Sequence, residues 1–149
     1  MNTNKAIYFD MDGTLANLYA VKDWLPKLQS EDATPYAEAK PLVKLNVLAR
    51  KLNALQRDGY KLGVVSWLAK NGSYEYNKQV TATKRKWLST HLKSVSWDEL
   101  HIVEYGTPKH KVVNNPKGLL FDDEAKNRND WTGTAYDEKE ILRILKNVS

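Results

Sequence analysis

The sequence has no cysteine among its 149 residues, so it forms no disulfide bond and offers no thiolate to a metal ion. This absence is compatible with a cytoplasmic protein, which we expect. No apolar run approaches the roughly 20 residues that a membrane-spanning helix needs. The polar start Met1–Lys5 leads into a short apolar stretch that acids soon interrupt. We therefore expect neither a membrane span nor a signal peptide.

What the chain does contain is typical of a folded globular protein. Hydrophobic residues make up 42% of it and charged residues 28%, within the range of ordinary folded domains. With 149 residues, a single domain over 1–149 with a sizeable core is expected. Lys and Arg outnumber Asp and Glu by 23 to 18, a formal net charge of +5. This excess favours anionic ligands through the summed field of the protein.

Short apolar runs alternate with helical patterns along the chain. Strands are expected at residues 4–9, 61–66, 100–104 and 118–121. Helices are expected at 41–58 and 76–92, followed by a short helix after Thr107-Pro108 and a terminal helix that opens with the capping box 137–140. In the first helix, Pro41 suits the first turn and Gly59 the C-terminal cap. The alternation predicts an α/β fold with a doubly wound parallel sheet.

Residues 16–40 depart from this alternation. They mix prolines and aromatic residues with no regular period, which predicts a short cap insertion after the first strand rather than a piece of the core. Its aromatic residues Tyr19, Trp24 and Tyr36 have two open interpretations: they stack on a base or sugar, or they pack the cap.

Polar side chains follow the predicted strands at the points where the strands end. In parallel sheets such groups gather just beyond the carboxyl ends of the strands. The groups here are Asp10 with Asp12, Ser66, Lys109, and Asp122 with Asp123. A hydroxyl and a lysine hold a phosphate by hydrogen bond and by charge, so this set is suited to phosphoryl transfer.

Carboxylates gathered at one sheet edge repel one another unless a cation relieves them. Mg²⁺ prefers oxygen ligands and is typically held by one or two carboxylates together with substrate phosphate. We expect Asp10 and the pair Asp122-Asp123 to supply carboxylates, and the backbone carbonyl near Asp12 to supply a further oxygen. Either acid of the pair could contact the metal, and we favour Asp122.

The order of these residues resembles the haloacid dehalogenase-like (HAD) superfamily of phosphohydrolases. Its first motif, Asp-x-Asp-Gly-Thr-Leu after a hydrophobic strand, is matched at every specified position by residues 10–15. Its second motif, a strand-end Ser or Thr, matches Ser66, and its third, a lysine, matches Lys109. The fourth, an acidic pair after a strand, matches Asp122-Asp123. The resemblance implies a Rossmann-like core and a Mg²⁺-dependent phosphomonoesterase.

Specific roles follow from this resemblance. Asp10 would attack phosphorus and form an aspartyl-phosphate, and Asp12 would protonate the leaving oxygen and later activate water. The implied catalytic set is Asp10, Asp12, Ser66 and Lys109. The implied phosphate-binding groups are Ser66, Lys109, Gly13 and Thr14. The implied Mg²⁺ site comprises Asp10, Asp12, Asp122 and Asp123.

One branch of the superfamily is more similar than the rest. Residues 84–88, Lys-Arg-Lys-Trp-Leu, followed by His91 and by the run 118–123, resemble the 5′(3′)-deoxyribonucleotidases and their small bacterial and phage relatives. This likeness implies a nucleotide or deoxynucleotide substrate. The insertion of about 25 residues is short for a cap of that branch, which implies a more open site.

Plainer interpretations stand beside these. Asp12-Gly13 is also typical of a tight turn, and Ser66 of a strand-end hydroxyl bonded to local backbone. Lys109 has Lys111 close by, and either could be a solvated helix residue. The acids at 122–123 are also typical of helix caps. His91, His101 and His110 lack the spacing of metal ligands.

Two other functions remain open. The basic residues 84–86 usually form a solvated helix face, yet they are also compatible with nucleic-acid binding, and then with a phosphatase acting on a nucleic-acid end. A catalytically silent module that binds phosphate or nucleic acid is the alternative from another class. The intact pair Asp10 and Asp12 argues against a silent module.

Overall fold

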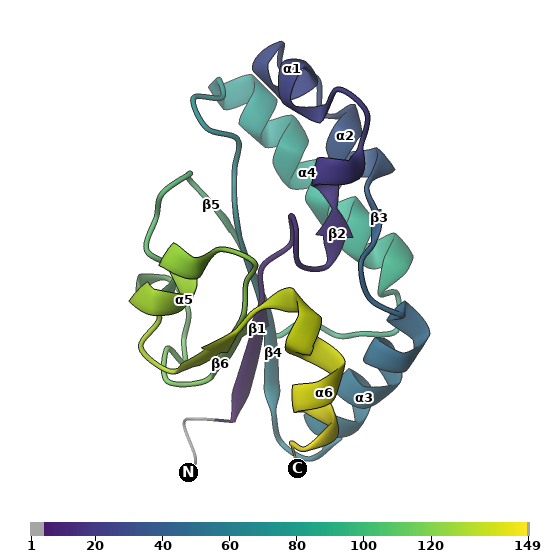
Figure 1. Cartoon of the computed structure of the whole chain (residues 1–149), viewed down its shortest axis with the longest axis vertical. Coiled ribbons are helices and arrows are strands. Elements are labelled where there is room, and N and C mark those ends of the chain that lie inside the picture. The colour runs from purple at the N-terminus through teal and green to yellow at the C-terminus, as the bar shows by residue number, and fades with distance from the viewer. Residues whose placement is uncertain (1–4, 149) are drawn as a thin grey trace.

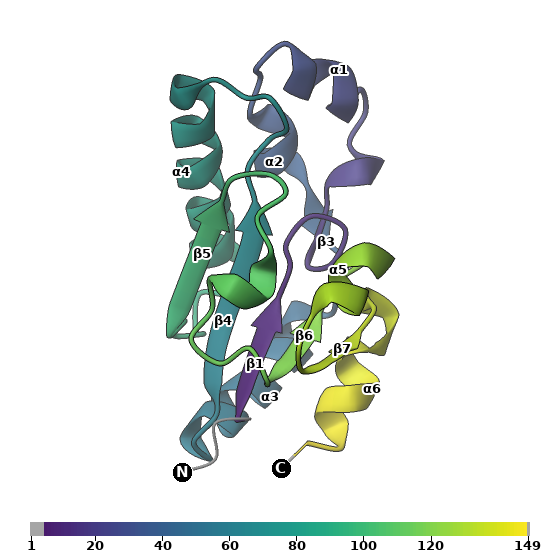
Figure 2. The same cartoon turned by 90° about the vertical axis from the view of Figure 1, so that its left-hand side faces the viewer.

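A five-stranded sheet forms the centre of the protein, which is described over residues 5–148 by a computed structural model. The strand order is β5-β4-β1-β6-β7, and every neighbouring pair is parallel. Figure 2 shows the strands side by side. Their bounds are β1 Ala6–Phe9, β4 Lys61–Trp67, β5 Glu99–Val103, β6 Leu119–Phe121 and β7 Thr134–Tyr136. The predicted α/β fold with a parallel sheet is confirmed.

Strand β1 lies in the middle of the sheet and is fully buried, as a continuous apolar run predicts for a strand covered on both faces. Its side chains alternate between two cores. Ile7 and Phe9 belong to the larger core, and Ala6 and Tyr8 to the smaller one. Because β1 is the central strand, Asp10, which follows it directly, lies in the middle of the row of carboxyl-terminal strand ends.

The two faces of the sheet are covered unequally. Helices α3 (Leu45–Arg57) and α6 (Ile141–Lys146) and the C-terminal part of α4 (Tyr74–His91) pack on the larger core. The opposite face carries the 3-10 turn η2 (Lys109–Lys111), helix α5 (Ala125–Asp130) and Trp131. In Figure 1, α3 and α6 lie on one side of the strands and α5 on the other. Within the described residues, no helix has the length and apolar character needed to cross a membrane.

The predicted insertion is a small cap. It contains β2 (Ala16–Asn17), the turn η1 (Leu18–Ala20), α1 (Trp24–Gln29), α2 (Thr34–Glu38) and β3 (Lys40–Pro41). Strands β2 and β3 pair antiparallel and form a stem for the cap. Its apolar side chains pack on the N-terminal part of α4, above the sheet in Figure 1.

Some predicted boundaries were wrong. The helix expected from Pro41 begins at Leu45, because Pro41 pairs with Ala16 in the cap stem. The helix ends at Arg57, one residue before the predicted Asp58. Gly59 follows as expected, and its φ of +99° allows the N–H groups of Gly59 and Tyr60 to bond back to the last turn. Of the strand predicted at 4–9, residue 4 lies outside the described residues.

Two further elements differ from the sequence prediction. Thr107-Pro108 precedes only the turn η2 rather than a capped helix, and neither β7 nor α5 was expected. At the C-terminus, the Asp137 side chain caps the following turn by accepting a hydrogen bond from the N–H of Lys139, whereas Glu140, the other side chain of the predicted capping box, accepts from Arg143. The capped turn is η3 (Glu138–Glu140), which leads into α6.

Candidate active site

A tight loop follows β1 and presents the first two acids. The Met11 carbonyl accepts hydrogen bonds from the N–H groups of three residues, Thr14, Leu15 and Ala16. Gly13 adopts a φ of +82°, and its N–H donates to the Ala16 carbonyl at 2.8 Å. A turn and an acidic site therefore coexist in this loop, so the two interpretations of Asp12-Gly13 do not exclude one another.

Three carboxylates meet beyond the ends of β1 and β6. Asp10, Asp122 and Asp123 each offer an oxygen, and these atoms lie within 4.8 Å of one another. The Thr14 hydroxyl connects two of them: it lies 3.1 Å from Asp10 Oδ2, to which it donates, and it accepts the Asp123 N–H at 3.1 Å. The loop after β1 and the loop after β6 are thus fixed to each other at the acids.

Burial changes the acidity of this cluster. Burial, and next the negative charge of Asp10, raise the pKa of Asp122 to about 6. Burial, followed by the hydrogen bond and charge of Asp10, raises the pKa of Asp123 to about 8. Both shifts express the cost of holding several carboxylates together in a poorly solvated place, and a cation would lower that cost.

Lys109 supplies part of the opposite charge. Its Nζ atom lies 2.9 Å from Asp10 Oδ1 and 2.7 Å from Asp122 Oδ2, over the ring of Trp67. Burial disfavours the ammonium, but the two carboxylates outweigh it and raise the pKa of Lys109 above its usual value. Lys111 is exposed, so the structure places Lys109, not its neighbour, among the acids.

The remaining acid of the first motif lies apart from the cluster. The Asp12 carboxylate accepts a hydrogen bond from Lys84 Nζ at 2.9 Å. Lys84 also donates to Ser66 Oγ and to the Trp67 carbonyl, each at 2.7 Å. Burial raises the pKa of Asp12, with Lys84 opposing the shift. Sequence reasoning placed Lys84 on a solvated face, which is wrong, because the side chain is only 1% exposed.

The side chains of this region carry a net negative charge that favours a bound cation. Two lysines, Lys84 and Lys109, face four carboxylates, which gives a formal 2 − 4 = −2 when all are ionised. The three clustered acids are hard oxygen donors of the kind Mg²⁺ prefers. Three of the four acids of the predicted magnesium site, Asp10, Asp122 and Asp123, therefore fit a metal ion, whereas the Asp12 carboxylate is held by Lys84 outside this cluster.

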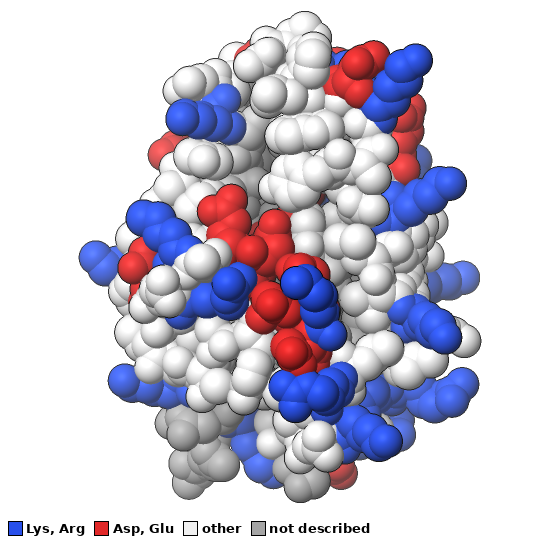
Figure 3. All heavy atoms as spheres, in the orientation of Figure 1, with Lys and Arg blue, Asp and Glu red and all other residues white. Residues whose placement is uncertain are grey.

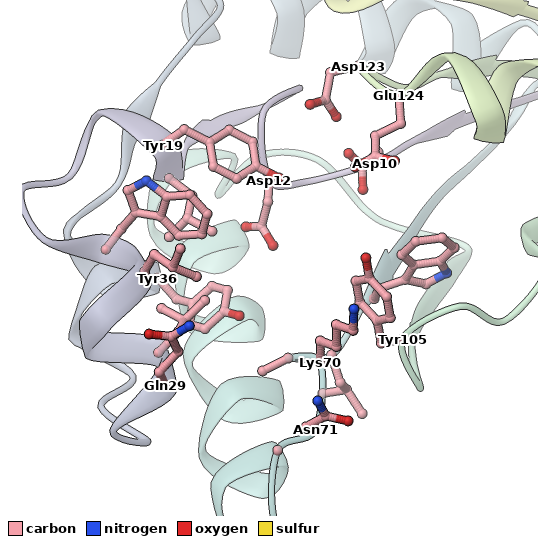
Figure 4. Close-up of a pocket in the computed structure, with 18 of the residues that line it drawn as sticks. Asp10, Asp12, Tyr19, Gln29, Tyr36, Lys70, Asn71, Tyr105, Asp123 and Glu124 are labelled. Carbon is pink, nitrogen blue, oxygen red and sulfur yellow. The ribbon is translucent and has the colours of Figure 1, made fainter.

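A cavity of about 770 Å³ opens beside these acids, between the cap and the core. Figure 3 shows the acidic side chains gathered on this face, below a largely uncharged hollow. In Figure 4, Tyr19, Tyr36 and Gln29 of the cap line one side, and Lys70, Asn71 and Tyr105 lie on the other. Asp10, Asp12, Asp123 and Glu124 line its acidic end. The two loop segments that carry Lys70, Asn71 and Tyr105 have no sequence pattern that indicates a part in a binding site.

The structure thus brings most of the predicted site residues together. Asp10, Asp12 and Asp123 line the cavity with Lys109, whereas Asp122 lies fully buried behind them. Ser66 is also fully buried, and its hydroxyl accepts from Lys84. The phosphate-binding roles of Ser66, Gly13 and Thr14 stay predictions.

The three histidines lie outside the acidic cluster. His91 packs on the ring of Trp87, and His101 Nε2 lies 2.8 Å from a Glu99 oxygen. His110 is half-buried in the turn η2. None of the three is part of the cluster formed by Asp10 and the acids at 122–123.

No family model matches this sequence, and no curated protein matches it. Among solved structures, the chain is similar to D,D-heptose 1,7-bisphosphate phosphatase from Burkholderia thailandensis, with 10% sequence identity and a TM-score of 0.48. The match covers 83% of this chain and 69% of that chain. A likeness of this size carries no information about activity, so the chemistry of the site rests on its own residues.

Proposed function

We propose that the protein is a Mg²⁺-dependent phosphomonoesterase of the HAD type that acts on a nucleotide or deoxynucleotide through an aspartyl-phosphate at Asp10. One observation carries this proposal. The Asp10 carboxylate lines the cavity while Lys109 and Thr14 hold its two oxygens and two further acids stand beside it. A fixed carboxylate in a cavity, next to a candidate cation site, is suited to attack a phosphate ester.

Mg²⁺ would be held by Asp10, Asp122 and Asp123, with the Asp12 carbonyl as a further oxygen. When bound, it would neutralise acids and phosphate oxygens and so allow an anionic substrate to approach an anionic nucleophile. Lys109 contributes to the same end. An ammonium has three N–H donors, and two of them are directed at Asp10 and Asp122, which leaves one for a phosphate oxygen.

The chemistry takes place in two transfers. In the first, an Asp10 oxygen bonds to phosphorus as the bond from phosphorus to the ester oxygen breaks, and the leaving oxygen takes a proton from Asp12. In the second, Asp12 takes a proton from water as the water oxygen bonds to phosphorus, and the bond to Asp10 breaks. Inorganic phosphate leaves, and both side chains return to their starting forms.

The lining of the cavity supports a nucleotide. Tyr19 of the cap and Tyr105 of the core lie on opposite sides of the cavity (Figure 4). Each packs against a tryptophan that also lines the cavity, Trp24 and Trp67 respectively. Flat apolar surfaces of this kind stack on a base. The side-chain amides of Gln29 and Asn71 add donors and acceptors suited to base edges. The cavity volume of about 770 Å³ also leaves room for more than a phosphate and a sugar.

Phosphate release from a panel of esters tests the proposal. The panel contains deoxynucleotides, ribonucleotides, sugar phosphates and oligonucleotides with a 3′ or 5′ phosphate, each assayed with magnesium and with a chelator. We expect magnesium-dependent release that is fastest with a mononucleotide and is lost in Asp10→Asn. Asp130→Asn is the matched control, because Asp130 is exposed and pairs only with Lys126 on its own helix among the described residues.

The alternatives give different results in this panel. Preference for phosphate-ended oligonucleotides would identify a nucleic-acid end phosphatase. Magnesium-dependent release confined to sugar phosphates would retain the phosphatase and overturn the nucleotide substrate. Release from no ester, together with binding of a nucleotide or phosphate by the native protein, would favour the silent module. Full activity in Asp10→Asn would overturn the proposed nucleophile.

A further inference from the structure

Lys84 is a buried cation with a complete set of partners. Its side chain is 1% exposed, and Nζ lies 2.9 Å from Asp12 Oδ2, 2.7 Å from Ser66 Oγ and 2.7 Å from the Trp67 carbonyl. The ammonium also lies 5.0 Å from the centre of the Tyr36 ring. Since an ammonium has three N–H donors and no acceptor, these three bonds use all its donors, and none is left for substrate.

The position of Lys84 follows from the periodicity of α4. The buried residues of this helix recur at intervals of three or four and form one stripe: Tyr76, Val80, Lys84, Trp87 and Leu88. A lysine on such a stripe loses its hydration and is retained only where partners replace the water. Two of its acceptors, Ser66 and Trp67, lie in β4, and the third, Asp12, lies in the loop after β1.

The three acceptors differ in how the fold holds them. Ser66 and Trp67 belong to the end of β4 and pair there with Ile102 and Val103 of the neighbouring strand β5. Asp12 instead has a side chain that is 17% exposed and lines the cavity. The bonds to β4 hold the ammonium in place, and its remaining N–H holds the Asp12 carboxylate in one orientation beside the cavity.

We propose that Lys84, anchored by Ser66 and Trp67, is the positioning residue for the Asp12 carboxylate. This inference rests on the proposed function, in which Asp12 exchanges protons with the leaving oxygen and with water. It gives Ser66 a part that the sequence did not indicate: its hydroxyl holds Lys84 in place rather than facing the cavity. The ring of Tyr36 extends this arrangement to the cap.

The leaving group of the substrate tests this inference. An alkyl ester such as deoxythymidine 5′-monophosphate needs a proton on its leaving oxygen, whereas p-nitrophenyl phosphate releases a stable anion without one. In Lys84→Met, we expect kcat/KM for the alkyl ester to fall about 10- to 100-fold, and the loss with the nitrophenyl ester to be at least several-fold smaller. Lys86→Met, the same change at an exposed site on the same helix, should match the native protein with both esters.

A double-mutant cycle supplies a second readout with the nitrophenyl ester. If Lys84 acts through Asp12, adding Lys84→Met to Asp12→Asn should cause less than about a twofold further loss. Ser66→Ala should give a smaller loss than Lys84→Met and add little to it. It also serves as the second variant if Lys84→Met does not fold, and it should then show the same preference for the nitrophenyl ester.

Three results would overturn the inference. The first is unchanged kinetics in Lys84→Met. The second is an equal loss of activity with both esters, and the third is a full additional loss of activity when Lys84→Met is added to Asp12→Asn. The second and third results are expected of a lysine that only stabilises the fold. A raised KM in Ser66→Ala that persists without Lys84 would return Ser66 to direct phosphate binding. Failure of the native protein to hydrolyse either ester would overturn the proposed function itself.

Discussion

Glu31, at the tip of the cap, accepts hydrogen bonds from both the backbone N–H and the hydroxyl of Ser73, at 2.7 and 2.8 Å. Ser73 is the N-cap residue of α4, and its hydroxyl oxygen also accepts the N–H of Tyr76. The Tyr76 hydroxyl donates in turn to the Asp32 carbonyl. These hydrogen bonds hold the tip of the cap to the start of α4, beside the cavity that Glu31 lines.

Removing this fastening should loosen the cap without disturbing the acids. In Glu31→Ala, we expect faster amide hydrogen exchange over residues 24–38 and a KM about 3- to 10-fold higher, with kcat nearly unchanged. Glu38→Ala, at an exposed glutamate of the same insertion, is the control. Exchange in the cap that is equal in the two variants would show that the Glu31 contact does not hold it.

Gly13 should be irreplaceable for two separable reasons. An alanine there would need a φ of +82°, and its Cβ would clash with Asp123 Oδ2 and lie 2.8 Å from Tyr19 Cε2. We expect Gly13→Ala to lower the free energy of unfolding by about 2–4 kcal/mol and to weaken magnesium binding. Gly59→Ala carries a similar backbone cost, with nothing within 4 Å of its Cβ, and should cost only about 1 kcal/mol. Equal losses in urea unfolding would contradict the clash.

The acidic cluster should make stability depend on pH and on magnesium together. The pKa values of Asp122 and Asp123 are raised to about 6 and about 8. A carboxyl with a raised folded-state pKa stabilises the protein while it is protonated, and that stability is lost as the pH rises through the folded-state value. We therefore expect the Tm of the metal-free protein to fall from about pH 5 to about pH 9.

Magnesium should reverse this loss, because it binds the ionised acids. At a concentration about 100-fold above its Kd it should add about 3 kcal/mol of stability, chiefly at the alkaline end of the range. Asp123→Asn should flatten both responses, whereas Asp130→Asn should keep them. The measurement is the Tm across this pH range, with magnesium and with chelator. An increase in Tm on adding magnesium that does not depend on pH would exclude these carboxylates as its ligands.

The sequence was sufficient to predict those parts of the site that depend on one local pattern. Residues 10–15 predict a strand end followed by paired acids, and the parallel sheet then brings Lys109 and the acids at 122–123 to the same edge. The choice between Lys109 and Lys111 could not be made from the sequence, because only the packed turn η2 buries one of them.

Other features depended on contacts distant in sequence. Lys84 has the same local context as Arg85 and Lys86, and only its place on the stripe with Val80 and Leu88 distinguishes it. The helical spacing of these residues is visible in the sequence, but the run of basic residues at 84–86 favoured a solvated face for all three. Pro41 was assigned to a helix because its partner in the cap stem, Ala16, lies 25 residues earlier. Strand β7 is as short as β6, but its residues Thr134–Tyr136 lack the continuous apolar run that marks β6, as suits a strand at the edge of the sheet.

The cap stem has one more consequence. The insertion leaves the core at Ala16 and returns to it at Pro41, and these two residues pair with each other. A chain segment whose ends are adjacent can change in length or composition without moving the elements on either side of it. In the proposed function, the acids beyond the strand ends and the cap surface that would meet the rest of the substrate come from different segments of the chain. A graft of a different cap between these two residues should therefore change substrate selectivity while Asp10 and the acids at 122–123 keep their places.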